Sequence, residues 1–594
     1  MSHDILPPHV AEALPCTRRR FVEGLALGGL VAAAGLPGIS TAEPVLEKSN
    51  SAKTQAVPEL AGNTLDLVIG EQRVNFTGLL RTAITVNGSL PAPILRFREG
   101  DKLTLRVRNT LEEDTSIHWH GFILPANMDG VPGLSFHGIA PGETFTYEFP
   151  LKQSGTYWYH SHSAMQEARG LYGAIIVEPK TPEPFHYDRE HVVLLSDWSD
   201  TDPHNILLNL KKQASYYNHH QRTVGDFFRD VKGKGFAAAW TDRKQWGQMR
   251  MTPTDLADVS AAAYTYLVNG ATPASNWTGL FKPGEKIRLR FINAAAMTYF
   301  DIRIPGLKMT VVAADGQNVQ PVAVEEFRIG VAETLDVIVE PVEPAYTIFA
   351  QSADRSAYAR ATLARAAGLS AAIPALDPRP LLSMADMGHD MGSMDADMAG
   401  MDHSAHGMHH GMQMQSHPAS ERNNPGVDMQ AMMPMARLDD PGVGLRESDR
   451  PGVTRRVLTY ADLKSAFPDP DGREPSRDIE LHLTGHMERY VWSFDGIPFA
   501  SAEPLKLKYG ERVRLVLVND TMMEHPIHLH GMWSDLEDEN GNFMVRKHTI
   551  SMPPGTRRTY RVTADALGRW AYHCHLLMHM DSGMFREVRV EVDV

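Results

Sequence analysis

A cysteine lies between two histidines near the C-terminus, in the stretch AYHCHLLMHMDSGM at 571–584. Both side-chain types bind metals, and alternate residues of an extended chain point to the same face. His573 and His575 are therefore expected to face one way and Cys574 the other. This peptide predicts two adjacent metal sites joined by one short segment of backbone.

Further candidate ligands accompany the cysteine. His579 and Met584 follow it, and His525 opens the segment HPIHLHG. One cysteine, two histidines and a weak axial methionine form the trigonal ligand set of an electron-transfer copper. The sequence thus predicts one such copper, bound by His525, Cys574, His579 and Met584.

Four His-x-His pairs occur in the chain, in IHWHG, YHSHS, IHLHG and YHCH. On a strand, each pair offers two imidazoles to a common site. Eight imidazoles suit a cluster of several ions, although imidazole alone does not distinguish copper from zinc, iron or nickel. A structural zinc site would need only four ligands and would favour more cysteine. The eight histidines are His118, His120, His160, His162, His528, His530, His573 and His575.

Three segments share one pattern and indicate the elements that must position these ligands. They are REGDKLTLRVRN (98–109), KPGEKIRLRFIN (282–293) and KYGERVRLVLVN (508–519). Their apolar–polar alternation is typical of half-buried strands, and copies about 200 residues apart predict three related β domains.

The three copies align without gaps when residues are counted from the last asparagine of each pattern and from the later turns. The first and third domains then each carry two His-x-His pairs. The middle copy has Ile302 and Ile304 at one pair and Ala350 and Ser352 at the other. We therefore expect the middle domain to be a spacer without copper ligands.

The 594 residues exceed what one hydrophobic core organises. We expect β domains at 58–180, 181–375 and 451–594, with a Met/His-rich linker at 376–450. Residues 384–435 hold 13 of the 29 methionines and few other large hydrophobic residues. Thioethers favour Cu(I), so the linker is a candidate collector of cuprous ions. The alternative is a disordered linker with incidental methionines.

The N-terminal segment 1–42 resembles a twin-arginine export signal, with Arg18 and Arg19 ahead of a weakly apolar run. Such a signal implies the twin-arginine export machinery and a periplasmic location; the alternative is a short membrane anchor. Beyond it, no apolar run reaches the roughly 18 residues of a membrane helix, so no stable membrane insertion is expected.

The net charge of −14, without a long basic run, argues against nucleic acid as a binding partner. Cys16 would leave with the signal, so Cys574 has no partner for an internal disulfide.

The segments HWHG, HSH, HPIHLHG and HCHLLMHMDSGM together resemble the signature segments of the multicopper oxidases, and the resemblance extends from about residue 60 to 594. The surrounding sequence and the Met/His-rich linker look most like the periplasmic copper-resistance protein A branch. The resemblance implies an all-β fold of three cupredoxin-like Greek-key β-barrel domains, with the linker between the second and third.

The resemblance also implies four copper ions. A type 1 copper is held by His525, Cys574, His579 and Met584, and a type 2 copper by His118 and His528. Two type 3 coppers are held by His120, His160, His162, His530, His573 and His575. Family members oxidise a substrate one electron at a time at type 1 and reduce dioxygen to water at the other three.

Two positions bear on proton supply. Asp129, in NMDGVPG, matches an acid that relatives place near the three-copper cluster, although a simple turn aspartate before Gly130 is the alternative. Met580 stands where several relatives carry a glutamate on a proton path, and methionine cannot relay protons.

The sequence therefore predicts a periplasmic copper-dependent oxidase that turns Cu(I) into Cu(II), with dioxygen as acceptor, and so protects the cell from copper. The first alternative is a laccase-like enzyme acting on small phenols. The second is a copper-sequestering protein in which binding matters more than turnover. A copper nitrite reductase is disfavoured, because it needs fewer paired histidines than both terminal domains supply.

Overall fold

A computed structural model describes residues 56–388 and 415–592. These residues belong to one compact unit, Thr54–Val594. The segment 1–42, predicted to be an export signal, and the central part of the Met/His-rich linker lie outside the described residues. Among the helices that the structure does describe, none has the length and apolar character that crossing a membrane requires.

The first domain contains two β-sheets, with strand orders β1-β4-β9-β8-β6 and β3-β2-β5-β7. Burial alternates along β2 and β5, because one face of each strand lies on the core. The strands are β1 (Glu59–Ala61), β2 (Thr64–Val74), β3 (Arg81–Val86), β4 (Ala92–Arg98), β5 (Lys102–Asn109), β6 (His118–His120), β7 (Thr144–Pro150), β8 (Gly155–His160) and β9 (Tyr172–Glu178).

The second domain repeats this plan, with sheets β11-β10-β13-β18-β15-β16 and β12-β20-β19-β14-β17. Its central strands are buried along their whole length. The strands are β10 (Arg189–Trp198), β11 (Thr265–Val268), β12 (Trp277–Leu280), β13 (Ile287–Asn293), β14 (Phe300–Arg303), β15 (Met309–Ala314), β16 (Gln317–Val324), β17 (Glu326–Ile329), β18 (Thr334–Val339), β19 (Ala345–Ser352) and β20 (Tyr358–Ala364).

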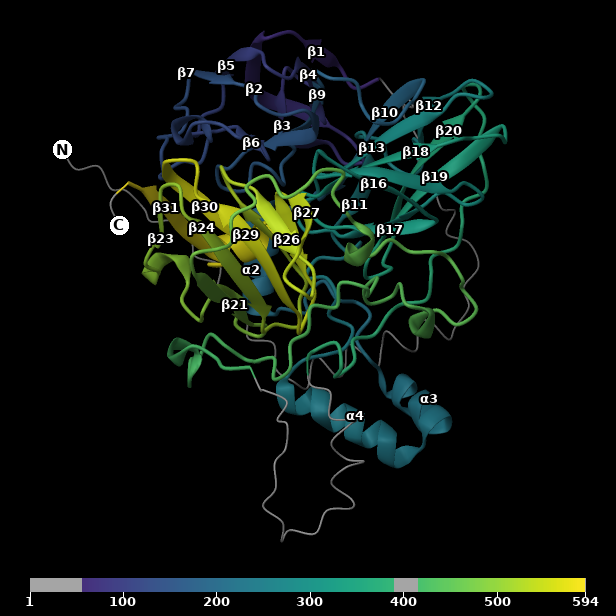
Figure 1. Ribbon diagram of the computed structural model, residues 1–594. Helices are drawn as coiled ribbons and strands as arrows, with labels where there is room; N and C mark the ends of the chain where they lie inside the picture. The colour runs from purple at the N-terminus through teal and green to yellow at the C-terminus, as the bar shows by residue number, and fades with distance from the viewer. Residues whose placement is uncertain (1–55, 389–414, 593–594) are drawn as a thin grey trace, which may run out of the picture. The chain divides into compact units, whose positions relative to one another are not determined.

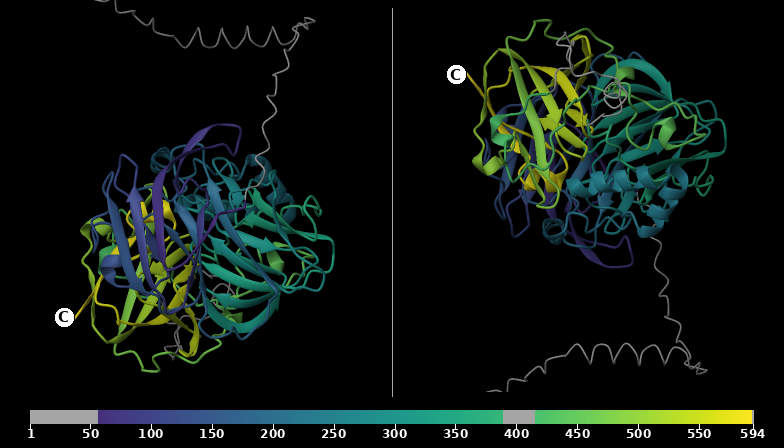
Figure 2. Two further views of the ribbon diagram at one scale, coloured as in Figure 1. Left: turned by 90° about the horizontal axis from the view of Figure 1, so that it is seen from above. Right: turned by 90° about the horizontal axis from the view of Figure 1, so that it is seen from below.

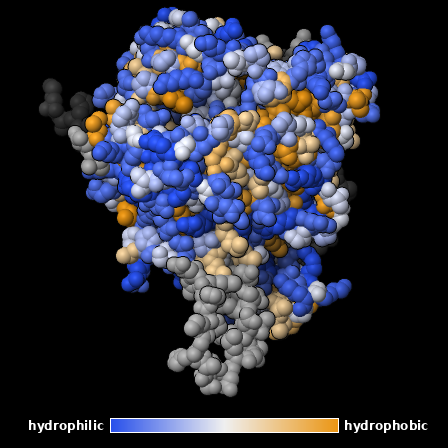
Figure 3. All heavy atoms as spheres, viewed as in Figure 1, coloured by the Kyte–Doolittle hydropathy of each residue, from blue (hydrophilic) through white to orange (hydrophobic). Residues whose placement is uncertain are grey.

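The third domain has sheets β22-β21-β24-β29-β26-β27 and β23-β31-β30-β25-β28. Its strands are β21 (Asp478–His486), β22 (Val491–Phe494), β23 (Leu505–Lys508), β24 (Arg512–Asn519), β25 (His525–Leu529), β26 (Ser534–Glu537), β27 (Phe543–Lys547), β28 (Thr549–Met552), β29 (Arg557–Thr563), β30 (Gly568–Cys574) and β31 (Phe585–Glu591). Each of the three domains lies beside the other two in Figures 1 and 2. Hydrophilic residues cover most of the face seen in Figure 3.

The repeated sequence pattern forms equivalent strands. β5, β13 and β24 each pair in parallel with an earlier strand and antiparallel with a later one. Each ends at a buried asparagine, Asn109, Asn293 or Asn519, whose side-chain amide donates to two carbonyl groups of the following segments. The prediction of an all-β chain with three related domains is confirmed.

Helices were not predicted, and most of them lie between β10 and β11. They are α2 (Pro203–Lys212), α3 (Val224–Lys234) and α4 (Phe236–Met249), while α6 (Leu577–Asp581) follows the cysteine. Start signals for two of them are present in the sequence. Asp202 accepts a hydrogen bond from the His204 N–H, and Thr223 and Asp226 form a capping box. The α3–α4 pair extends from the β domains in Figure 1.

The described flanks of the Met/His-rich linker are packed rather than free. Met387 and Met429 are buried, because methionine fills irregular core gaps as well as it binds metal. The Met433 N–H donates to the Gly388 carbonyl, so the two flanks meet. The Asp428 N–H donates to the Gly485 carbonyl at the edge of the third domain. An unstructured linker therefore does not describe these flanks. They include the short 3₁₀ turns η2 (Ala419–Glu421) and η3 (Glu447–Asp449); the other such turns are η1 (Ala126–Met128), η4 (Tyr460–Asp462) and η5 (Phe499–Ser501).

Candidate copper centres

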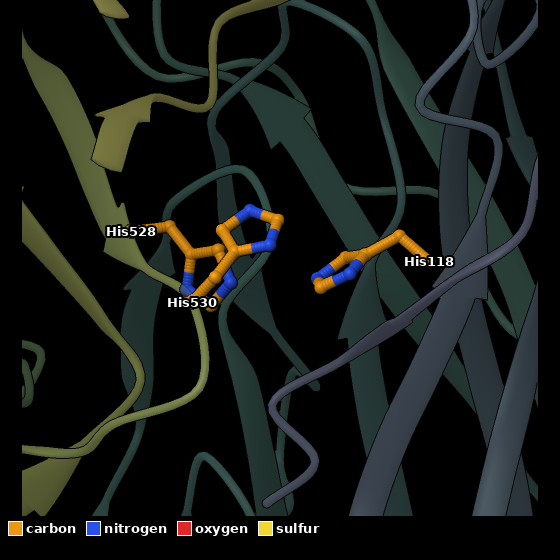
Figure 4. Close-up of side chains that lie close together, drawn as sticks. All are labelled: His118, His528 and His530. Carbon is orange, nitrogen blue, oxygen red and sulfur yellow. The ribbon is translucent and has the colours of Figure 1, made fainter. Parts of the chain in front are cut away.

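The four His-x-His pairs meet where the first and third domains face each other. Within the domains, β6 sets His118 opposite His160 on β8, and β25 sets His528 opposite His573 on β30. Across the interface, His162 Nε2 lies 3.3 Å from His573 Nε2. Figure 4 shows His118 of the first domain facing two histidines of the third. The structure therefore brings the predicted pairs together.

The middle domain lacks this histidine set in the described residues. β14 and β19 pair Ile302 with Ala350, at the place where the other domains pair histidines. Both residues are fully buried. The alignment of the three copies is therefore confirmed at this register, and the middle domain fills the equivalent space with apolar side chains.

The outward nitrogens of the clustered histidines are held by hydrogen bonds. His118 Nδ1–H donates to the Asp129 carbonyl at 2.8 Å, and His528 Nδ1–H to the His548 carbonyl at 2.6 Å. His160 Nδ1 lies 2.6 Å from a Glu167 carboxylate oxygen. Such contacts fix the ring orientation and tautomer of a metal-binding histidine.

Ring nitrogens of five of these histidines are buried and have no hydrogen-bond partner. Buried polar atoms are nearly always paired, so a group of unpaired nitrogens at one point is what a metal-binding site requires. The residues present thus fit a metal cluster. The orphaned atoms are His118 Nε2, His120 Nδ1, His160 Nε2, His528 Nε2 and both ring nitrogens of His575.

Electrostatics favour neutral imidazoles at this interface. Burial, followed by the repulsion of neighbouring rings, holds the pKa of His120, His160 and His528 well below the usual value. Burial lowers the pKa of His573 to about 4. Neutral rings keep the lone pairs that metal binding requires.

A second group lies on the opposite side of the same peptide. Cys574 Sγ is 3.4 Å from His525 Nδ1 and 3.8 Å from His579 Nδ1, and these two nitrogens are 3.1 Å apart. The Cys574 N–H donates to the Met584 carbonyl, which places this buried methionine next to the group. Three donors at these separations can surround a single ion.

A thiolate at Cys574 would need a cation beside it in this pocket. Burial raises the pKa of the Cys574 thiol well above its usual value, because a lone thiolate is poorly solvated there. Metal binding deprotonates a thiol outright. The geometry and the chemistry of the donor set therefore fit the predicted electron-transfer copper.

Comparison with known proteins decides the family. Family models described as multicopper oxidase match residues 68–182, 189–369 and 472–594, which together exceed half of the chain. The chain belongs to the multicopper oxidases. These enzymes couple oxidation of a substrate to reduction of dioxygen and use four copper ions, one of type 1, one of type 2 and two of type 3.

Similar multicopper oxidases include curated relatives and solved structures. Copper resistance protein A of Escherichia coli is 62% identical, over 97% of this chain and all of the relative. The protein of that name from Pseudomonas syringae pv. tomato is 63% identical, over 97% and 99%. Fet3p, a multicopper oxidase that functions in iron import, has a TM-score of 0.61 at 19% identity, covering 90% of this chain and 91% of that one. This similarity shows the three-domain cupredoxin-like fold.

Several residues at the two sites carried no signal in the sequence. His548 lies between the pairs: its Nδ1 is 3.2 Å from His120 Nε2, and its carbonyl accepts the hydrogen bond from His528. Asp258, from the middle domain, accepts a hydrogen bond from His579 Nε2–H at 2.7 Å. The middle domain is therefore more than a spacer, because its Asp258 orients the imidazole of His579, one of the candidate ligands beside Cys574.

The middle domain also supports the loop that carries His548. Asp315 Oδ2 accepts the His548 and Thr549 N–H groups. Lys547, only 1% exposed, lies 3.0 Å from Asp315 and 3.2 Å from Glu333. These buried pairs tie the second domain to the third beside the histidine cluster.

Replacing Lys547 with methionine should lower the free energy of unfolding by about 3–5 kcal/mol, because two buried carboxylates lose their partner. Denaturant unfolding of the copper-free protein measures this. Lys506→Met, at an exposed lysine on β23, is the matched control and should change stability little. Equal effects of the two substitutions would contradict the role of the buried pairs.

Proposed function

We propose that this multicopper oxidase oxidises Cu(I) to Cu(II) and so confers copper resistance. Four cuprous ions supply four electrons, and dioxygen takes these with four protons to give two waters. His525, Cys574, His579 and Met584 would hold the type 1 copper, which would accept one electron at a time. His118 and His528 would hold the type 2 copper, and the type 3 coppers would be held by His120, His160, His162, His530, His573 and His575.

A small cavity next to the type 1 ligands carries this proposal. It measures about 40 Å³, and its lining includes Met297, Met522, Met523, Asp258 and Glu524. Thioethers are soft ligands that select Cu(I). Asp258 lines the cavity and also accepts the hydrogen bond from the ring of His579. Only Asp258 would therefore separate an ion in the cavity from a ligand of the type 1 copper, which accepts the electron.

The size of the cavity disfavours a phenol as occupant. An engineered apolar cavity that binds benzene measures about 150 Å³, whereas the space observed here is about 40 Å³ and suits a single ion. A phenol would have to donate electrons from the protein surface. The complete donor sets of both copper centres also argue against a purely sequestering role, since storage needs no electron path to dioxygen.

Steady-state oxygen uptake with Cu(I) and with a phenol tests the substrate. Met523→Leu keeps the apolar volume but removes the sulfur. We expect a loss of at least about tenfold in the rate with Cu(I), equal to about 1.4 kcal/mol, and an unchanged rate with the phenol.

Met309→Leu, at a buried methionine of β15 outside the cavity lining, is the control and should leave both rates unchanged. Equal losses on both substrates in Met523→Leu would refute Cu(I) binding in the cavity. Absence of catalytic oxygen uptake with Cu(I) in the unaltered enzyme would instead favour sequestration.

Location and copper supply complete the proposal. Residues 1–42 would direct export by the twin-arginine machinery to the periplasm, which is consistent with relatives named copper resistance protein A. The methionines and histidines of residues 389–414 would collect Cu(I) for the cavity.

A further inference from the structure

Four potential ligands gather in the third domain away from the two copper centres. His417 and Glu421 come from the flank of the Met/His-rich linker, around η2. His482 lies on β21, labelled near the lower edge of the third domain in Figure 1, and Asp520 follows the end of β24. Segments about 100 residues apart in sequence thus converge on one point.

Three of the four separations in this group are close to those between ligands of a single ion, and the fourth, between Asp520 and His482, is a hydrogen bond that a bound ion would replace. Asp520 Oδ2 lies 3.2 Å from His417 Nδ1 and 2.5 Å from His482 Nδ1. Oxygens of Glu421 lie 3.4 Å from His417 Nδ1 and 3.7 Å from His482 Nδ1. Bonds of about 2.0–2.2 Å to a tetrahedral ion put its ligands roughly 3.3–3.6 Å apart.

The surrounding contacts orient these donors. His482 Nε2 lies 3.3 Å from Glu480 Oε1, so a carboxylate holds the far side of the ring while Nδ1 points inward. Gln430 Nε2–H donates to Glu421 Oε2 at 2.8 Å. A carboxylate on the outer nitrogen is typical of metal-binding histidines, and His579 has the same arrangement with Asp258.

The group is buried, and one of its carboxylate oxygens has no hydrogen-bond partner. Asp520, Glu421 and His482 are at most 3% exposed. Glu421 Oε1 is buried and has no hydrogen-bond partner. A divalent cation would take the place of the ring protons that otherwise face these carboxylates, and with both rings deprotonated it would balance the two negative charges.

We infer that His417, Glu421, His482 and Asp520 form a fifth metal site, which binds a divalent transition-metal ion and Cu(II) before others. Two imidazole nitrogens and two carboxylate oxygens suit Cu(II) and Zn(II), of which Cu(II) binds more tightly at a given site. The absence of sulfur ligands makes the site unsuitable for Cu(I). The occupant would then be an ion of the form that the proposed reaction releases.

The site is linked to the type 1 ligands by one residue. Thr521 follows Asp520, and its Oγ1 lies 2.7 Å from His525 Nε2. Thr521 thus connects an ion held by Asp520 to the imidazole ring of His525. Binding of this ion is therefore expected to alter the spectrum of the type 1 copper, which can be measured without turnover.

The test is titration of the four-copper holoenzyme with Cu(II), followed by electron paramagnetic resonance. We expect one further equivalent with nitrogen and oxygen ligands. Glu480→Gln, which removes the charge behind His482, should weaken this binding about 10–100-fold. His417→Ala, at the most exposed of the four residues, should weaken it at least as much. Retention of the blue absorption and of all four coppers shows that these variants remain folded.

Histidines in the neighbouring segment require a control. Replacing His389, His403, His406, His409 and His410 together with alanine should leave the fifth equivalent in place. Loss of the fifth equivalent in that variant, with retention in His417→Ala, would overturn the site. Absence of a fifth equivalent of Cu(II) in the unaltered holoenzyme would also overturn the metal site. The group would then hold only a proton shared by His482 and Asp520. Neither result depends on oxygen uptake, so the proposed oxidase function is tested separately.

Discussion

Replacing Cys574 with serine is expected to abolish oxygen uptake with both Cu(I) and phenols and to remove the blue absorption of the enzyme. The thiol is fully buried and lies 3.4–3.8 Å from the two ring nitrogens of its site. Serine fits the same space, but its hydroxyl does not replace the soft thiolate that an electron-transfer copper requires. Because His573 and His575 flank this residue, the substitution also removes the shortest path between the two centres.

Copper content separates this effect from general damage. The histidines of the other centre are unchanged, so Cys574→Ser should lose one copper of four and keep a folded structure, as its unfolding midpoint would show. Oxygen uptake at the rate of the unaltered enzyme, or persistent blue absorption, would contradict the assignment of Cys574.

The candidate copper ligands could be predicted because the patterns that identify them lie within short segments of the sequence. A strand period of two places His118 with His120 and separates Cys574 from its neighbours, and these relations need no tertiary structure. Copies of one domain then supply the rest, since equal spacing from Asn109 and Asn519 puts both sets at the same point of the fold. The structure adds how the two domains face each other across the ligands.

Residues that act between domains could not be predicted in this way. Asp258 and His548 reach the two centres from loops whose sequences carry no metal-binding pattern. The methionine composition of residues 384–435 was also ambiguous, because Met387 and Met429 serve the core. Contacts that span hundreds of residues depend on how the domains pack, which periodicity does not encode.

The same contact recurs at four histidines of the described residues. The outer nitrogen of the ring faces a carboxylate in His579 with Asp258, in His482 with Glu480, in His160 with Glu167, and in His530 with Asp129. Such a carboxylate orients the ring and raises the basicity of the inward nitrogen. Asp129 is in addition an acid beside the histidine cluster, where the reduction of dioxygen would consume protons.

Asp129 lies in a tight turn and also contacts a histidine of the cluster, so we propose that it has both of the roles that the sequence left open. It ends η1 in front of Gly130, whose φ of +80° and close approach to the Ile117 carbonyl leave no room for a side chain. This turn brings Asp129 Oδ2 within 2.7 Å of His530 Nδ1, while its own carbonyl accepts the hydrogen bond from His118. Its other oxygen, Oδ1, is buried and has no hydrogen-bond partner.

Asp129→Asn is therefore expected to slow oxygen reduction by about 10²–10⁴-fold, the usual contribution of a positioned acid or base. Asparagine can still accept from His530, so all four coppers should bind. Anaerobic bleaching of the blue colour by Cu(I) should keep its rate, and only the reaction of the reduced enzyme with dioxygen should slow. Met580 cannot relay protons, so no neighbouring acid at that position would compensate.

Asp129→Ala separates orientation from proton supply. It removes the hydrogen-bond acceptor of His530, and should weaken copper binding at the cluster about 10–100-fold. Stopped-flow measurement of both half-reactions across pH distinguishes the two variants. If Asp129→Asn reacts with dioxygen at the original rate over the whole pH range while Asp129→Ala loses copper, Asp129 only orients His530, and the protons reach dioxygen by another route.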